Sequence, residues 1–204
     1  MNRLLICMFT IIMGSIISHP AHALFDARLT YGLLASKPDM TALFPGQATV
    51  PAIAPTYGLG ADVIVSPPLF PLGFGLRYEN MGVSASSGSL EFKANYTRTA
   101  VLINYRIIDT LLFLGPIFSY GLSHSGSVKA INGGTEIANF SSSKISSYSV
   151  GLEAGAKLIG FNIGAEAGIQ DFRWKDAQDS TNTLATQDLN LSGSYMKVLV
   201  GFGI

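Results

Sequence analysis

The chain ends in Met196-Lys197-Val198-Leu199-Val200-Gly201-Phe202-Gly203-Ile204, and this stretch decides the fold class. Every even position in it is apolar, whereas the positions between them hold a lysine, a leucine and two glycines. In a β-strand, successive side chains point to opposite faces, so a period of two separates one face from the other. The stretch therefore predicts a strand with one continuous apolar face.

The same alternation recurs in seven earlier segments. They span residues 25–33, 57–65, 72–79, 101–107, 112–122, 148–158 and 161–170. Each is close to the ~9–11 residues that a tilted membrane strand needs. The chain is 48% hydrophobic and only 13% charged, yet beyond its N-terminus no segment approaches the ~20 apolar residues of a spanning helix. We therefore predict an all-β protein, an eight-stranded antiparallel up-and-down transmembrane β-barrel.

Long and short connections between these segments alternate along the chain. The long ones are 36–54, 81–92, 123–147 and 171–190, and the short ones are 66–71, 108–111 and 159–160. Bacterial barrels place short turns in the periplasm and long loops outside the cell, so both termini are expected on the periplasmic side. The first long loop is rich in apolar residues. Residues 130–144 and 175–188 are rich in Asn, Gly, Ser and Thr and are expected to be flexible loops.

Residues 1–23 are interpreted as a cleaved signal peptide. Arg3 precedes an apolar stretch from Leu4 to Ile17, and Ala21-His22-Ala23 provides the small–x–small cleavage pattern. The barrel domain then covers 24–204, and an N-terminal membrane anchor is the alternative. Cys7 is the only cysteine, so the mature chain would contain neither a disulfide nor a thiol.

Aromatic residues on the apolar face gather toward the two ends of the predicted strands. The set near the extracellular end is Tyr31, Tyr57, Tyr78, Tyr120 and Tyr148, and the single tryptophan, Trp174, is expected at the same interface. Tyrosine and tryptophan are favoured at headgroup level, where their amphipathic rings lie between lipid and water. A soluble β-sandwich would have no reason to sort tyrosines by strand direction.

The positions between the apolar residues carry nearly all the charges of the predicted strands. They are Arg28, Asp62, Arg77, Glu79, Arg98, Arg106, Glu153, Lys157, Glu166 and Lys197. Side chains can fill the interior of an eight-stranded barrel, and buried charges require partners. We expect an ion-pair network that plugs the lumen, with a narrow polar channel or a small anion site as the alternative.

Ser123-His124-Ser125 is the one candidate for catalysis. His124 is the only histidine beyond the signal segment, and a histidine beside serines can act as base and nucleophile in an esterase. Glu136 or Asp171 would then orient the imidazole. In lipid A deacylases a serine follows the histidine by two residues on one strand face, a position that is Gly126 in this chain. A polar loop entrance explains the same residues.

The eight alternating segments and the C-terminal strand resemble the small bacterial outer-membrane barrels of the OmpA/OmpX-like type over residues 24–204. The resemblance implies residence in the outer membrane, contact with the lipid bilayer and lipopolysaccharide, and insertion by machinery that reads the last strand. Such strands usually close with Phe, whereas this chain has Phe202 and then ends at Ile204.

The function expected from the sequence is a non-enzymatic outer-membrane barrel that supports the envelope or makes surface interactions. A lipid-modifying hydrolase using His124 and a narrow solute or lipid conduit are the alternatives. The net charge of zero argues against nucleic acid as a partner. No nucleotide-binding glycine pattern follows a predicted strand, and we predict no cofactor and no metal site.

Overall fold

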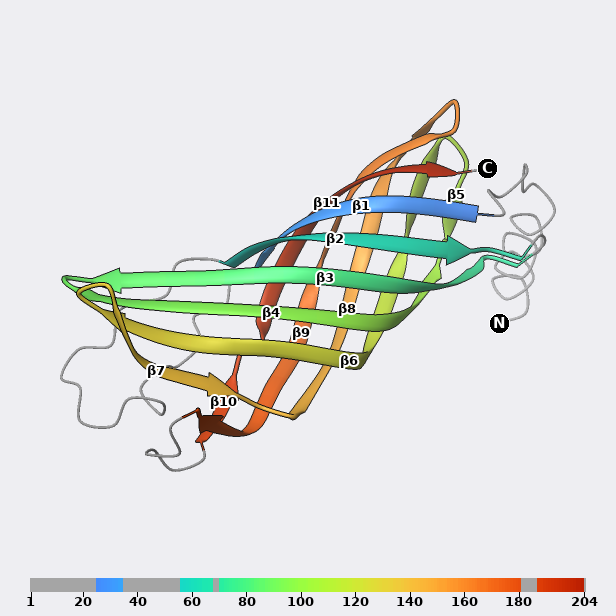
Figure 1. Ribbon diagram of the computed structural model, residues 1–204. Coiled ribbons are helices and arrows are strands. Elements are labelled where there is room, and N and C mark those ends of the chain that lie inside the picture. The colour runs from blue at the N-terminus through green and yellow to red at the C-terminus, as the bar shows by residue number, and fades with distance from the viewer. Residues whose placement is uncertain (1–24, 35–55, 68–69, 181–186, 204) are drawn as a thin grey trace, which may run out of the picture.

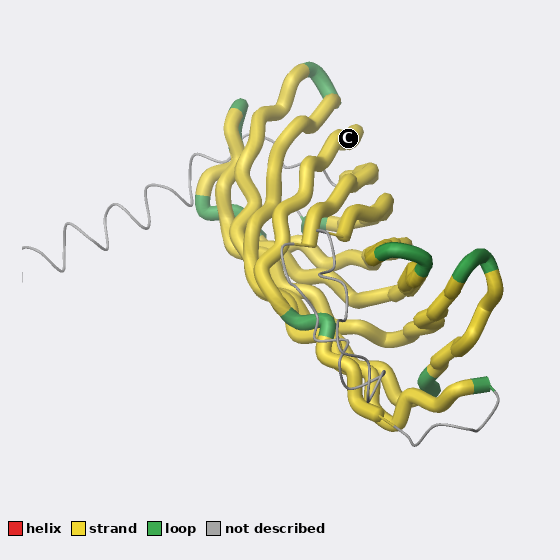
Figure 2. Tube along the Cα trace, turned by 90° about the vertical axis from the view of Figure 1, so that its left-hand side faces the viewer, coloured by secondary structure: helices red, strands yellow, loops and turns green. Residues whose placement is uncertain are grey.

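The computed structural model describes residues 25–34, 56–67, 70–180 and 187–203. The strands are β1 (Phe25–Leu34), β2 (Thr56–Val65), β3 (Leu72–Ser87), β4 (Leu90–Tyr105), β5 (Ile108–Asp109), β6 (Leu112–Asn132), β7 (Thr135–Ser141), β8 (Lys144–Leu158), β9 (Phe161–Asp179), β10 (Gln187–Asn190) and β11 (Gly193–Gly203). Figure 2 shows strands joined by short connections throughout this part of the chain. Among the described residues, no helix is long and apolar enough to cross a membrane.

Eight of the strands form a closed antiparallel ring (Figure 1). Consecutive long strands pair in the order β1, β2, β3, β4, β6, β8, β9 and β11. The first and last strands close the ring, with Leu29 opposite Val200. Closure satisfies the backbone hydrogen bonds of every member strand, as a sheet in lipid requires. The prediction of an eight-stranded antiparallel barrel is confirmed.

Exposed and buried side chains alternate along the ring strands, and the exposed ones are apolar. The most exposed members of this outer belt include Leu29, Leu59, Leu122 and Ile169, which are 60–71% exposed. A soluble monomer rarely leaves so large a contiguous apolar surface in water. An apolar outer band over a polar interior is the arrangement of a transmembrane barrel.

The barrel has two distinct ends. At the terminal end, β1 begins and β11 finishes, and the β8–β9 turn lies beside them because Gly203 N donates to Gly160 O at 2.8 Å. At the opposite, far end, several strands continue well past the apolar belt (Figure 1). We call this part the extension; it comprises residues 82–97, 123–141, 171–179 and 187–190.

The structure of the extension contradicts the prediction that residues 81–92, 123–147 and 171–190 are long loops. Residues 81–92 form two strands joined by a tight turn at Gly88, which has a φ of 61°. Most of 123–147 and much of 171–190 are strand as well. In β4 the outward residues are Lys93, Asn95 and Thr97, and the buried inward residues are Phe92, Ala94 and Tyr96. The outward residues here are polar, so the apolar face turns inward while the period of two continues.

Inward side chains of the extension and of the adjoining parts of the ring strands form one apolar cluster that closes the far end of the interior. Its members are Leu34, Met81, Phe92, Ala94, Tyr96, Val128, Ala130, Ala138, Phe140, Phe172, Trp174, Leu189, Leu191 and Tyr195. Each is no more than 7% exposed. The interior therefore has two layers, an apolar layer at the far end and a charged layer between it and the terminal end.

Several sequence expectations lie outside the described residues. These are the signal segment 1–23 with its cleavage residues Ala21 and Ala23, the first long loop 36–54, and the final residue Ile204. They stay predictions.

Candidate functional site

The charged layer of the interior contains all ten charged residues expected there, and two more. We call the full set the charge lattice: the cations are Arg28, Arg77, Arg98, Arg106, Lys157 and Lys197, and the anions are Asp26, Asp62, Glu79, Asp109, Glu153 and Glu166. Eleven of these residues are buried, and Lys157 keeps 18% of its side chain exposed. Six positive and six negative side chains make the lattice neutral.

Arg77 occupies the middle of the lattice. Its Nε and Nη2 donate to Asp62 at 2.8 Å each, and its Nη1 and Nη2 donate to Glu166 at 2.9 and 2.6 Å. Two-pronged pairing of this kind is the strongest form that a guanidinium makes with a carboxylate. Tyr195 also donates to Glu166, at 2.7 Å. Arg77 therefore joins β2 and β3 to β9 on the other side of the lumen.

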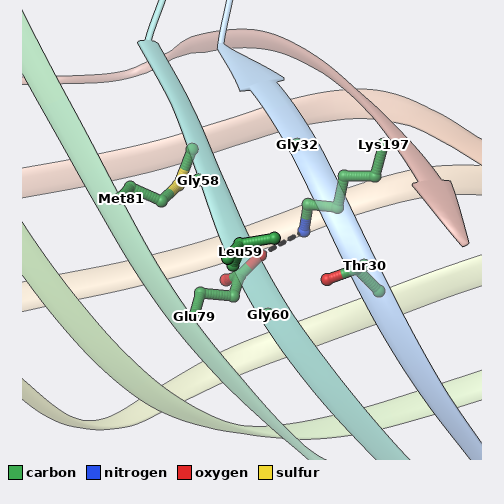
Figure 3. Close-up of a pocket in the computed structure, with 8 residues that line it drawn as sticks. All are labelled: Thr30, Gly32, Gly58, Leu59, Gly60, Glu79, Met81 and Lys197. Carbon is green, nitrogen blue, oxygen red and sulfur yellow. Dashed lines mark ion pairs between the residues drawn. The ribbon is translucent and has the colours of Figure 1, made fainter.

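On the side of the lattice nearer the apolar layer, Glu79 forms ion pairs with two cationic side chains. The Arg98 guanidinium lies 2.6 Å from it, and Lys197 forms a second ion pair with it from β11. Figure 3 shows Lys197 reaching across β1 toward Glu79, with Thr30 beside the pair. Here Gly32 leaves room for the lysine chain, because an added Cβ would lie 3.2 Å from Lys197 Cγ.

Toward the terminal end, Glu153 is the centre of a second group. It accepts from Arg28 Nη1 at 2.5 Å, Arg106 Nε at 3.3 Å and Asn104 Nδ2 at 2.7 Å. Asp26 joins the same arginines, and Asp109 joins Arg106 and Lys157. Sequence reasoning missed both aspartates. Asp26 lies two residues before Arg28 and therefore on the same inward face, so the alternation of side chains could have identified it. Asp109 lies in residues 108–111, which were expected to form a short turn.

The free space beside Lys197 is small. A lumenal pocket beside Lys197, lined also by Thr30, Gly58 and Gly60, has a volume of about 10 Å³ (Figure 3). That is roughly the volume needed by one water molecule. A solute larger than water has no passage through this pocket while the ion pairs hold.

His124 enters the interior because of a β-bulge in β6. The pairing of β4 with β6 shifts between Thr99 and Ala100, which leaves Leu122 as the extra residue. Without that shift His124 would share the lipid-facing parity of Leu122; with it, the imidazole turns inward. Gly121 provides the space, since a Cβ there would overlap Nε2 of His124.

The predicted partnership of His124 with Ser123 and Ser125 is wrong. Both serines are exposed, and Ser125 instead forms a 2.6 Å hydrogen bond with Thr97. The imidazole Nε2 lies 2.8 Å from the hydroxyl of Ser147 on β8. Successive side chains of a strand point to opposite faces, so with the imidazole turned inward both neighbouring serines face outward.

Ser147 is buried, whereas His124 is half-buried. Ser147 is 3% exposed, and its oxygen also accepts from Arg98 Nη1 at 3.2 Å. Phe172 meets the imidazole edge-on at a centroid distance of 5.7 Å. A lipid ester outside the barrel cannot reach this hydroxyl in the observed arrangement.

The proposed orienting acids are engaged elsewhere. Asp171 accepts from Ser192 at 2.7 Å and from Arg173 at 2.9 Å, and Glu136 accepts from Lys129 at 2.8 Å. The hydrogen bond from Lys129 lowers the pKa of Glu136, which lies in the extension. Within the described ranges, no group of three or more His, Cys, Asp or Glu side chains is placed to hold a metal ion.

Four of the expected interface tyrosines lie on the outer surface. Tyr31, Tyr78, Tyr120 and Tyr148 are 44–51% exposed, and Tyr120 lies directly opposite Tyr148 across β6 and β8. Tyr57 belongs to β2, and its side chain lies outside the described part.

The prediction for Trp174 is wrong. Its side chain is fully buried in the apolar layer, where its ring lies against Gly126. At this height of β9 the inward face is the apolar one, so the indole packs into the interior instead of the lipid boundary.

Comparisons with known proteins identify the fold. No family model matches the sequence, and a search of curated protein sequences gives no significant match. A major outer membrane protein of Thermus thermophilus matches with a TM-score of 0.53 at 10% identity, over 90% of this chain and 100% of that one.

Two further matches have lower TM-scores. Neisserial surface protein A (NspA) gives 0.45 at 15% identity over 88% and 97% of the two chains. The outer membrane protease OmpT of Escherichia coli gives 0.47 at 10% identity over 89% and 94%. The closed ring, the apolar outer belt and the Thermus match together identify this chain as a β-barrel with the fold of bacterial outer-membrane proteins.

Proposed function

We propose that the protein is a non-enzymatic and non-conducting outer-membrane anchor that presents the extension at the cell surface for interactions there. The observation that carries this proposal is the neutral charge lattice, which fills the lumen with paired side chains. Removing one member would leave the buried lattice with one uncompensated charge, which is strongly unfavourable. The lattice therefore favours a single closed state.

The orientation in the membrane is part of the proposal. Both termini would lie in the periplasm, and the extension would project outside the cell, as in barrels whose short turns are periplasmic. The outer belt would contact lipid, the polar outer face of the extension would meet lipopolysaccharide headgroups, and β11 would be read by the insertion machinery.

Electrical recording tests the closed lumen. We expect the purified full-length mature protein to add no discrete conductance steps to a planar lipid bilayer, while an open porin reconstituted in the same way gives steps. Reproducible steps from this protein would contradict the plugged lumen and favour a conduit.

Cysteine labelling tests the orientation, since Cys7 is the only cysteine of the chain. Ile137 in the extension is 49% exposed, and Ile159 in the β8–β9 turn is 100% exposed. On intact cells, a membrane-impermeant maleimide should label Ile137→Cys and should leave Ile159→Cys unlabelled until the membrane is disrupted. The reverse pattern would overturn the proposed orientation.

A lipid-modifying hydrolase is the second candidate, and the 2.8 Å contact between His124 and Ser147 is the observation in its favour. Burial of the serine and its engagement by Arg98 argue against it. Mass spectrometry of lipid A and phospholipids decides between the two. Identical lipid profiles in cells with the natural protein, His124→Ala and no protein support the anchor, whereas a His124-dependent loss of an acyl chain supports the enzyme.

A further inference from the structure

A second hollow lies at the far end of the barrel, between the β7–β8 connection and β9. It has a volume of about 310 Å³ and is lined by Ser141, Ser142, Ser143, Lys144, Asp176 and Gln178. We call it the tip pocket. Its volume lies at the lower end of the range for small-molecule sites, which is about 300–1,000 Å³.

Hydrogen bonds hold the framework of the tip pocket. Ser142 Oγ donates to Lys175 O at 2.5 Å and accepts from Lys144 N at 3.0 Å, which joins the two walls. Asp176 N donates to Asp188 Oδ1 at 3.0 Å. Asp176 has a φ of 51°, a region that aspartate tolerates better than most residues. These hydrogen bonds fix the backbone on both sides of the tip pocket.

The remaining polar groups face water. In the described part of the chain, no side-chain hydrogen bond or ion pair engages Ser141, Ser143 or Gln178. Ser141 and Gln178 are directly opposed across β7 and β9. The rim of the pocket thus offers two hydroxyls and one amide at close range, and each of these groups can both donate and accept.

The charges of the tip pocket cancel. Lys144 Nζ lies 2.5 Å from Asp176 Oδ2, and the side chains are 68% and 50% exposed. Hydrogen bonding to Asp176 raises the pKa of Lys144, so the ammonium stays charged at neutral pH. Each member of this pair also keeps hydrogen-bonding capacity beyond this one contact.

This donor and acceptor set distinguishes between classes of ligand. A phosphate site needs an excess of positive charge or of N–H donors, and a calcium site needs several carboxylate or carbonyl oxygens. A neutral pocket with both donors and acceptors suits hydroxyl groups, which act in both ways. Saccharides present several hydroxyls on one small ring.

We propose that the tip pocket binds a neutral saccharide, with Asp176, Gln178 and Ser141 as its main hydrogen-bonding residues. The assignment deepens the proposed function and rests on it for the claim that the pocket faces the outside of the cell. The pocket is shallow and has no aromatic lining residue in the described chain. A single site of this kind should bind with a dissociation constant on the order of 1 mM.

Saturation-transfer NMR on the full-length mature protein in lipid nanodiscs tests the assignment. The probes are glucose, galactose and N-acetylglucosamine, with inorganic phosphate and calcium as separate arms. Asp176→Asn and Gln178→Ala remove individual pocket groups, and Lys129→Ala is the matched control because Lys129 forms an exposed ion pair with Glu136 outside the pocket. Heat-modifiable gel migration verifies that each variant is folded.

The expected result is saturable binding of at least one sugar, weakened about fivefold or more in either pocket variant, as loss of one hydrogen bond predicts, and unchanged in Lys129→Ala. Absence of saturable sugar binding, or undiminished binding by both pocket variants, would overturn the assignment. Saturable phosphate binding, or calcium binding that is lost in Asp176→Asn, would also overturn the ligand class. Labelling of Ile137→Cys is scored separately, so the proposed function and the sugar site can fail independently.

Discussion

Arg77 and Glu166 are 89 positions apart in the chain and are joined across the lumen by two hydrogen bonds of 2.9 and 2.6 Å. Their strands, β3 and β9, are not neighbours in the ring. The contact therefore connects opposite walls of the barrel through its interior. Asp62 holds the other edge of the same guanidinium, so both prongs of Arg77 are occupied.

The first prediction concerns Arg77→Met, which keeps side-chain bulk and removes the charge. Asp62 would lose its ion pair with Arg77, and the remaining ion pair of Glu166 would be a 3.8 Å approach to Lys197. Breaking a buried ion pair on one side costs about 3–5 kcal/mol. Urea unfolding in lipid vesicles should show a loss of that size in the free energy of unfolding.

Arg173→Met is the matched control for Arg77→Met. Arg173 pairs with Asp171 at 2.9 Å, and 57% of its side chain is exposed. Exposed pairs contribute about 0–1 kcal/mol. Equal losses in both variants would mean that the charge lattice does not hold the barrel closed.

Sequence alone predicts the ring because lipid imposes one rule along the whole membrane span. Apolar residues such as Leu29 and Val200 must face outward, so a simple period of two gives the strand segments and their number. The rule reverses at the extension, where residues such as Lys93 face water and Phe92 faces inward. Serine-rich and asparagine-rich composition then resembles a loop, although the chain continues as strand.

The candidate site was harder to predict for a local reason. From Ser123 to Ser127 the chain reads Ser-His-Ser-Gly-Ser, and no apolar side chain there marks which face is inward. A one-residue bulge at Leu122, directly before such a stretch, leaves no signal, yet it moves every following side chain to the other face. The contact between His124 and Ser147 depends on that bulge and on a strand partner 23 residues away.

The second prediction tests the space that Gly121 provides. In Gly121→Ala the added methyl would overlap both His124 Nε2 and Ser147 Oγ. Overpacking of this kind costs about 1–3 kcal/mol. Removing the imidazole should relieve part of the cost, so a cycle with His124→Ala should give a coupling energy of at least about 0.5 kcal/mol. Strict additivity of the two substitutions would contradict this packing.

The third prediction concerns Trp174, the only tryptophan of the chain. Because the indole lies inside the apolar layer with 0% exposure, brominated phospholipids should quench its fluorescence weakly. A tryptophan at position 78 in the background of Trp174→Phe provides the comparison, since Tyr78 is 49% exposed on the outer surface. Tyr78→Trp should be quenched strongly. Equal quenching at the two positions would contradict the burial of Trp174 and would place its indole at the lipid boundary.

The fourth prediction separates strands from flexible loops in the extension. Residues 90–97 of β4 pair with β3 on one side and β6 on the other, beginning at Leu90, which lies between Ser87 and Asn132. Their amides should exchange with deuterium about a hundredfold or more slowly than unstructured chain, which corresponds to an opening free energy of about 3 kcal/mol. The turn residues Gly88 and Ser89 should exchange rapidly and serve as the internal comparison. Rapid exchange throughout 90–97 would mean that the extension is not a persistent sheet, and the tip pocket, which depends on the same sheet, would then lose its framework.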